Sequence, residues 1–465
     1  MIGVQDIADL NGGIREASTP GYFDSVDYVF DQMQAAGYVV TIQEFDYPFF
    51  EELEPAELEQ TAPNPFVYPN LDTTGDATGF ATMTYSGSGD VTAIAEGVDL
   101  LLPPAAAANT STSGCEATDF AGFTAGNIAV IQRGNCTFAL KAQNAEAAGA
   151  VGVIIFNEGQ PGRTDAFFGT LGGPGATVPV VGAAFDVGVE LAAGGVEVRM
   201  FVNATSEIRP SANVIAETPG GRDDRVVVVG AHLDSVPTGP GIQDNGSGSA
   251  AILEVALQMA ELNIEPRNKV RFAWWGAEES GLLGSQFYVD NLSPRDIKDM
   301  ALNLNFDMIG SPNFVRFVYD GNGSDTPLAG PNGSKNIESV FLNHFDEEGL
   351  PTEPTAFDGR SDYGPFIAVG IPAGGLFTGA EGIKTDEQVA IYGGTAGDQY
   401  DPCYHLACDT FDNISLEALD QMSDAVAHSV LTFAMTTSSV NGTDKGKGKG
   451  TWGDGMAFRG NQAVK

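Results

Sequence analysis

The second half of the chain limits the fold most, because patterns typical of strands and helices alternate there. Residues 226–229 are an uninterrupted run of valines, which is typical of a parallel strand buried on both faces. The following patterns predict helices at 247–262, 282–291, 336–348 and 416–435, and strands at 270–275, 302–306 and 371–376. This alternation predicts an α/β domain: a mostly parallel sheet with helices on both faces.

The first half is organised differently. Its first residues predict a helix at 4–17, interrupted by Gly12-Gly13, a helix at 22–36 and a strand at 38–45. The acidic, Pro- and Thr-rich stretch 48–90 predicts a linker or an extended crossing between units. A second unit at 91–202 has predicted strands at 128–132, 151–156, 178–181 and 196–202, and a helix at 137–148 capped by Thr137. We therefore predict a main domain of residues 1–50 and 208–440, an insertion at 51–207, and a disordered Gly- and Lys-rich tail at 441–465.

The charge of the chain excludes some classes of partner. It has 465 residues and a formal net charge of −40, from 62 Asp and Glu against 22 Lys and Arg. Because phosphates would be repelled, we expect neither nucleic acid nor an anionic membrane surface as a partner. No apolar run reaches the ~18 residues that a membrane span needs, so we expect no membrane association.

Four cysteines, Cys115, Cys136, Cys403 and Cys408, form two local pairs along the sequence. No Cys-x-x-Cys occurs, which argues against a zinc–thiolate site. Four cysteines allow three pairings, of which Cys115–Cys136 with Cys403–Cys408 is the most economical; four reduced, buried cysteines are the alternative. Disulfides would indicate an oxidising compartment, so we expect a secreted protein. Residues 1–10 lack a signal-peptide pattern, and we favour a removed leader over one that never existed.

Ionisable side chains follow the predicted strands of the α/β block. They are His232 and Asp234 after the first strand, Asp244 before a helix, Glu278 and Glu279 after 270–275, Asp307 after 302–306, and His405 in a late loop. Ligands of open α/β sheets bind at the carboxyl ends of strands, so these groups can converge on one cleft. Imidazoles and carboxylates without thiolates suit Zn²⁺, and their number matches two ions that share one carboxylate. The alternative for each acid alone is a solvated surface position, and His344 and His428 are expected to be ordinary helix residues.

Residues 232–412 closely resemble the M28 family of co-catalytic zinc aminopeptidases, in particular secreted bacterial leucine-type enzymes. The matching strings are GAHLDS (230–235), DNGSG (244–248), FAWWGAEE (272–279), NFDMIG (305–310), GRSD (359–362) and CYH (403–405). The resemblance implies a fold like that of zinc peptidases and phosphorylases. It also implies a cis peptide bond after Asp244.

The resemblance implies a role for each site residue. Asp244 would bridge two Zn²⁺, with Glu279 and His405 on one ion, His232 and Asp307 on the other, and Asp234 orienting His232. Glu278 would act as the general base and Tyr404 would donate to the oxyanion. Arg360 would contact the substrate, and acids at the cleft such as Asp307 would hold its α-ammonium group. A preference for bulky apolar N-terminal residues would involve Met308 and Phe377.

Two further features rest on resemblance. GNIAVIQRGNCTF (126–138), with Lys141-Ala142 and 147–150, resembles a protease-associated (PA) domain, a small α+β unit inserted into the peptidase. Such inserts resemble lids over the substrate site, and a passive structural insert is an equal alternative. Asp420 and Asp424 match a calcium site of the secreted subgroup, whose third ligand comes from an N-terminal segment without a match here.

These observations predict a secreted, monomeric di-zinc aminopeptidase that removes N-terminal residues, preferably bulky apolar ones such as Leu, from peptides and proteins. One alternative is a carboxypeptidase or dipeptidase of the same fold. Another is a peptidase-like binding scaffold with a dead site, against which the complete ligand set and Glu278 argue. A serine hydrolase is disfavoured because no Gly-x-Ser-x-Gly occurs.

Overall fold

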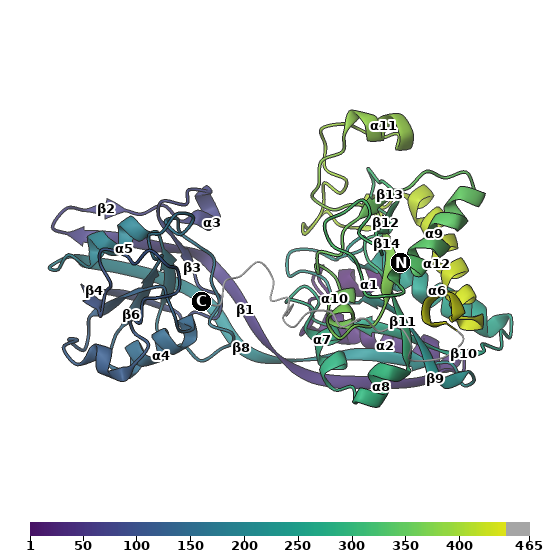
Figure 1. The fold of residues 1–465 in the computed structure, drawn as a ribbon, viewed down its shortest axis with the longest axis horizontal. Coiled ribbons are helices and arrows are strands. Elements are labelled where there is room, and N and C mark those ends of the chain that lie inside the picture. Colours follow the sequence, from purple (N-terminus) through teal and green to yellow (C-terminus); the bar gives the residue numbers. More distant parts are fainter. Residues whose placement is uncertain (443–465) are drawn as a thin grey trace. The chain divides into compact units, whose positions relative to one another are not determined.

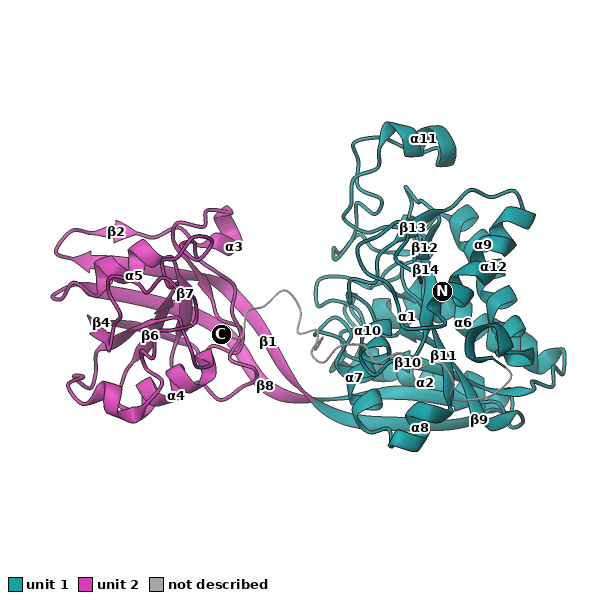
Figure 2. Ribbon diagram, in the orientation of Figure 1, with its two compact units in different colours: residues 1–46, 210–458 teal, residues 47–209, 459–465 magenta. Residues whose placement is uncertain are grey.

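The computed structural model describes residues 1–442, which form two compact units (Figures 1 and 2). Unit 1 consists of Met1–Asp46 and the described chain from Pro210 onward, and unit 2 of Tyr47–Arg209. The tail predicted to be disordered lies, from residue 443 on, outside the described residues. Within residues 1–442, no helix is both long enough and apolar enough to cross a membrane.

The sheet of unit 1 has the strand order β13-β12-β14-β11-β9-β10-β8. The strands are β8 (Glu197–Glu217), β9 (Arg222–His232), β10 (Asn268–Trp275), β11 (Met300–Phe306), β12 (Phe317–Tyr319), β13 (Glu353–Thr355) and β14 (Ala373–Phe377). The four central strands β14, β11, β9 and β10 are parallel, whereas β12 and β8 pair antiparallel with their inner neighbours. This confirms the predicted mostly parallel sheet.

Helices cover both faces of this sheet because the side chains of β9 alternate between two cores. Val227 and Val229 pack in one core with α2 (Pro20–Ala35), α6 (Gly246–Glu261), α9 (Ser334–Glu347) and α12 (Leu416–Met435). Val226 and Val228 pack in the other with Trp275 and residues of α7 (Leu283–Asp290) and α10 (Tyr363–Ala368). The remaining helices of the unit are α1 (Ile2–Leu10), α8 (Pro294–Asp299), α11 (Asp386–Tyr392) and α13 (Ser438–Asn441).

The register of the sheet brings the ends of the central strands to one edge. His232, the last residue of β9, lies opposite Trp275, the last residue of β10. Phe306, the last residue of β11, lies opposite Leu376 of β14. The segments that leave these strands therefore begin side by side at the carboxyl edge.

Unit 2 is a smaller α/β unit. It contains β2 (Phe66–Val67), β3 (Phe80–Thr82), β4 (Gly89–Val98), β5 (Ile128–Gln132), β6 (Gly152–Phe156), β7 (Val180–Ala183), α3 (Leu71–Thr74), α4 (Phe138–Ala147) and α5 (Phe185–Leu191). Strands β4 to β7 are parallel neighbours. The predicted cap is present, because the Thr137 side chain accepts a hydrogen bond from the backbone N–H of Leu140. The Cys115–Cys136 disulfide also lies in this unit.

The structure refines two predictions of local structure. Of the two possibilities for residues 48–90, a linker or an extended crossing between units, the extended one holds for the first part: β1 (Val39–Ala62) is a 24-residue strand that pairs with β8, and its buried side chains alternate at 45, 47 and 49 and again at 56, 58 and 60. Acidic residues on the other face hide this period-two pattern. The predicted helix at 4–17 does not continue beyond its interruption: it ends at Leu10, because Gly12 and Gly13 have φ angles of 79° and 87°, which a helix cannot accommodate.

Candidate active site

The predicted site residues converge at the carboxyl edge of the unit 1 sheet. His232 ends β9, Glu278 and Glu279 follow β10, and Asp307 follows β11. Asp244 precedes Asn245, the N-cap of α6, and His405 lies in the loop closed by the Cys403–Cys408 disulfide. The topology thus brings together side chains that are far apart in the sequence.

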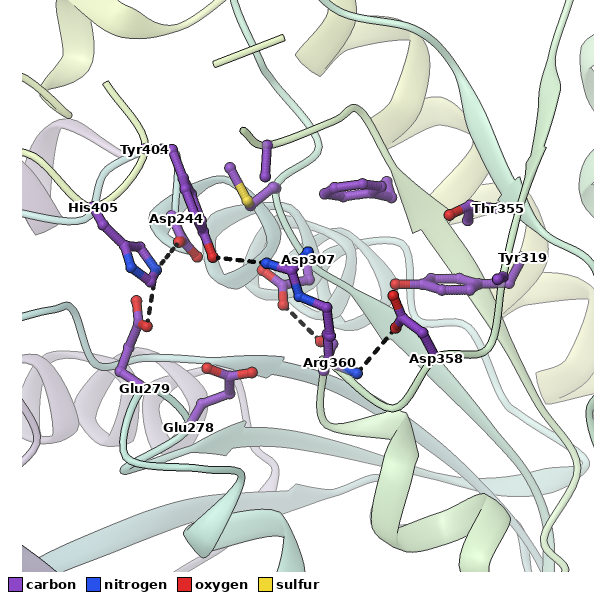
Figure 3. Close-up of a pocket in the computed structure, with 15 residues that line it drawn as sticks. Asp244, Glu278, Glu279, Asp307, Tyr319, Thr355, Asp358, Arg360, Tyr404 and His405 are labelled. Carbon is purple, nitrogen blue, oxygen red and sulfur yellow. Dashed lines mark hydrogen bonds and ion pairs between the residues drawn. The ribbon is translucent and has the colours of Figure 1, made fainter. Parts of the chain in front are cut away.

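Asp244 lies between the two imidazoles of the site. Its Oδ1 is 3.2 Å from His232 Nε2, and its Oδ2 is 3.2 Å from His405 Nε2. The same His232 nitrogen lies 3.3 Å from Asp307 Oδ1, and the same His405 nitrogen lies 3.1 Å from Glu279 Oε2. Each imidazole nitrogen is therefore flanked by two carboxylates, with Asp244 common to both. Figure 3 shows the pairs that His405 forms with Asp244 and Glu279.

Hydrogen bonds behind the cluster fix its members. Asp234 accepts the backbone N–H groups of Glu278 and Glu279 at 3.2 and 3.3 Å, and its Oδ1 is 3.5 Å from His232 Nδ1. The Ser361 hydroxyl donates to Asp307 Oδ2 at 2.6 Å and itself accepts from Asn305 Nδ2 at 2.8 Å. The orientation of these ligand candidates is thus set by the surrounding protein.

The donor atoms fit a metal site. Two groups of three have their potential ligand atoms within 4.8 Å of one another: His232 with Asp244 and Glu279, and His232 with Glu278 and Asp307. Glu279 Oε1 and Asp307 Oδ1 are buried and accept no hydrogen bond. Distances alone would allow either glutamate as a ligand, but His405 forms its ion pair with Glu279 and not with Glu278.

The electrostatics of the cluster indicate an excess of buried negative charge. Burial raises the pKa of Glu278 well above its usual range and that of Glu279 to about 7. Burial would lower the pKa of His405, but its hydrogen bonds to Asp244 and Glu279 outweigh this and raise the value to about 10. Asp244 is also buried, yet its bonds to the two histidines lower its pKa. A cation is the natural compensation for such a group of carboxylates.

A pocket of about 530 Å³, open to solvent, adjoins the cluster. The predicted substrate residues Met308, Arg360, Phe377 and Tyr404 all line it. The Arg360 guanidinium lies 2.8 Å from Glu381 Oε1. It also donates to the Tyr404 hydroxyl at 3.4 Å (Figure 3). The pocket is thus lined by metal-ligand candidates, by the apolar side chains of Met308 and Phe377, and by the guanidinium of Arg360.

The backbone is unusual at three positions of the site. Ala277, Met308 and His405 have φ angles of 54°, 54° and 58°, in the left-handed region that side chains disfavour. Ala277 precedes Glu278, and Met308 follows Asp307. Such conformations persist where the surroundings enforce them, and they cluster at functional sites. The Asp244–Asn245 peptide bond is cis, as the resemblance implied.

Sequence reasoning missed two buried residues that hydrogen-bond to the backbone around the cluster. Asp409, which is 2% exposed, accepts the backbone N–H groups of Gln243 at 2.8 Å and Asp244 at 3.0 Å. Arg15 is fully buried and donates to the carbonyl oxygens of Leu233, Pro240 and Gly241. The only sequence signal for Asp409 was its position directly after Cys408. Hydrogen bonds to backbone groups do not require particular partner residues, so they leave no pattern in the sequence.

The remaining histidines and the predicted calcium ligands lie outside the pocket lining. His344 and His428 stack on each other with ring centroids 4.8 Å apart. Asp420 and Asp424 are exposed on α12, and within residues 1–442 no third His, Cys, Asp or Glu forms a ligand group with them. Calcium binding there stays a prediction.

Sequence comparisons find relatives over almost the whole chain. The profile described as "Peptidase family M28" matches residues 213–430, and that of the PA domain matches 100–191. An aminopeptidase from Pseudomonas aeruginosa (strain UCBPP-PA14) is 49% identical over 442 residues, covering 94% of this chain and 80% of the relative. Leucine aminopeptidase 2 from Trichophyton equinum is 43% identical over 419 residues, covering 89% of this chain and 78% of the relative.

Solved structures with similar folds were also found. An aminopeptidase from Aneurinibacillus sp. strain AM-1 has a TM-score of 0.63 at 29% identity, covering 92% of both chains. BSAP, a zinc aminopeptidase from Bacillus subtilis, has a TM-score of 0.57 at 25% identity, covering 94% of this chain and 96% of BSAP. These similarities extend over both units.

Proposed function

The chain belongs to peptidase family M28 and contains a PA domain, and on that premise we propose that it is a zinc aminopeptidase that hydrolyses the first peptide bond of peptides and proteins. The observation that carries this proposal is the buried cluster in which Asp244 lies 3.2 Å from each of two imidazole nitrogens, beside an open pocket. The names of the relatives from P. aeruginosa and B. subtilis support the activity and the metal.

We place two Zn²⁺ ions at this cluster. Asp244 would contact both, Glu279 and His405 would hold one, and His232 and Asp307 would hold the other. The unsatisfied oxygens of Glu279 and Asp307 support this assignment, as does a donor set of imidazoles and carboxylates. When bound, such a pair of ions polarises the scissile carbonyl and lowers the pKa of a water molecule, so that its deprotonated form is available as a nucleophile near neutral pH.

Residues of the chain would then move the protons and hold the substrate. Glu278 lines the pocket without an ion-pair partner among the described residues, and we assign it as the base that takes a proton from the attacking water and delivers it to the leaving amine. Tyr404, whose hydroxyl faces the pocket beside Arg360, would donate to the developing oxyanion. Carboxylates of the cluster, Asp307 among them, would hold the free α-ammonium group, which restricts cleavage to the first residue.

The apolar part of the pocket supports a preference for bulky side chains. Met308 and Phe377 line it, and the fungal relatives are named leucine aminopeptidases. We therefore propose Leu as a preferred N-terminal residue. The two disulfides support an extracellular location, and we propose that the secreted protein acts as a monomer.

Blocking the substrate's amine tests the proposed function. The protein loaded with zinc is expected to release nitroaniline from leucine p-nitroanilide but not from its N-acetylated form, because acetylation removes the α-ammonium group. Absorbance assays at equal protein concentration measure both rates. Equal cleavage of both compounds would contradict an aminopeptidase, and cleavage of neither would favour a dead scaffold.

Replacing Asp409 tests how the site is held together. Asp409→Ala leaves two buried backbone N–H groups, those of Gln243 and Asp244, without their acceptor, so Asp244 should lose its fixed orientation. We expect zinc affinity to fall about 10- to 100-fold, as for other residues that orient metal ligands. Competition with a chromogenic chelator measures the affinity. The exposed Asp412→Ala serves as control, and equal affinity in both variants would contradict this role for Asp409.

A further inference from the structure

One wall of the pocket combines apolar side chains with a single carboxylate. Tyr319 and Phe377 supply ring surface and pack in one cluster with Tyr363, and Asp358 lies in the same pocket lining. In Figure 3, Asp358 and Tyr319 occupy the side of the pocket opposite to His405 and Glu279. A substrate whose α-amine lies at the metal cluster would therefore direct its first side chain along this wall.

The carboxylate of Asp358 is held in place but is not neutralised. Its Oδ1 accepts hydrogen bonds from the Tyr363 hydroxyl at 2.9 Å and from the backbone N–H of Arg360 at 3.1 Å. Tyr363 is 1% exposed, so the anchor is part of the core. Among residues 1–442, no Lys, Arg or His forms an ion pair with Asp358.

The nearby cation is already engaged elsewhere. Arg360 forms its ion pair with Glu381 at 2.8 Å, and its other terminal nitrogen donates to Tyr404 at 3.4 Å. Asp358 acts on this guanidinium only through space and forms no ion pair with it, so the carboxylate of Asp358 remains available to the pocket.

An apolar wall that ends at an unpaired carboxylate matches a side chain with an aliphatic stem and a cationic tip. We propose that Asp358 is a specificity-determining residue that makes peptides with N-terminal Lys or Arg good substrates, beside those that begin with Leu. This inference rests on the proposed aminopeptidase function. The net charge of −40 acts in the same direction, because it attracts cationic peptides at long range.

Lysine and norleucine p-nitroanilides test the proposal in the zinc-loaded full chain, because the two side chains have the same four-carbon stem and only one carries an ammonium group. We expect kcat/KM for the lysine substrate to equal or exceed that for norleucine at low ionic strength, and the ratio to fall as salt is added. Cleavage of norleucine with tenfold weaker cleavage of lysine would overturn this inference and leave the proposed function intact. Cleavage of neither would overturn both.

The variant Asp358→Asn removes the charge and keeps an oxygen that can accept both hydrogen bonds. We expect it to lower the lysine-to-norleucine ratio of kcat/KM by about fivefold, the effect of one partly exposed ion pair. Asp346→Asn, an exposed position on α9, changes the net charge by the same amount and should leave the ratio unchanged. An unchanged ratio in Asp358→Asn, or an equal fall in both variants, would overturn the role of Asp358.

Discussion

The variant Glu278→Gln is expected to lose about three orders of magnitude in kcat while keeping its full metal content. An amide has the same shape as the carboxylate but cannot accept a proton from the attacking water, and positioned acid–base groups contribute about 10²- to 10⁴-fold to rates. The ion pairs of the ligand set, including His405 with Glu279, do not involve Glu278. Leucine p-nitroanilide hydrolysis and elemental analysis of the same sample measure both properties.

The neighbouring glutamate provides the matched control. Glu279→Gln changes the adjacent residue in the same chemical way, and it removes the charge of a proposed metal ligand that lies 3.1 Å from His405 Nε2. We expect this variant to lose metal. Metal loss in Glu278→Gln with retention in Glu279→Gln would show that the roles of the two glutamates are the reverse of those proposed here.

Removing the metal is expected to abolish activity and to lower the melting temperature of the protein. Without cations, Asp244, Glu279 and Asp307 face one another across a buried cluster, and among residues 1–442 their ion pairs are with His232 and His405. An ion present at 1,000 times its dissociation constant stabilises the folded state by about 4 kcal/mol. Dialysis against a chelator, followed by calorimetry and zinc titration, measures the loss and its recovery.

The titration also tests the number of ions. Activity and melting temperature should recover together and reach a plateau at two equivalents of zinc per chain. A plateau at one equivalent would contradict the shared role of Asp244, and full activity in metal-free protein would contradict the whole metal assignment. Magnesium at the same concentration is the control, because it prefers octahedral oxygen ligands over imidazole.

The sequence predicted well which residues lie at the carboxyl edge of the sheet, since buried parallel strands have a strong signature. The valines of β9 indicated a strand covered on both faces, and the end of that strand predicted where His232 would lie. Parallel pairing then places Asp307 and the two glutamates at the same edge, whatever the details of packing.

Other features left no readable pattern. Asp409 and Arg15 act on backbone N–H and carbonyl groups, which every residue has, so no partner residue could point to them. Only the first part of β1 was predicted as a strand, at 38–45, because acidic side chains on its exposed face obscured the alternation of Tyr47 and Phe49 further on. The short helices α10 and α11 have too few turns to establish a period.

The left-handed backbone conformation at Ala277, Met308 and His405 affects which substitutions these positions can accept. We have proposed roles in substrate and metal binding for the side chains of Met308 and His405, whereas Ala277 contributes only a methyl group. Glycine there would relieve about 1 kcal/mol of steric conflict, but it would also give the unfolded chain more freedom, worth about 0.4–1 kcal/mol, so stability would change little. The lasting consequence of that replacement would fall on the backbone that precedes Glu278, which could then adopt more conformations and hold the proposed base less firmly.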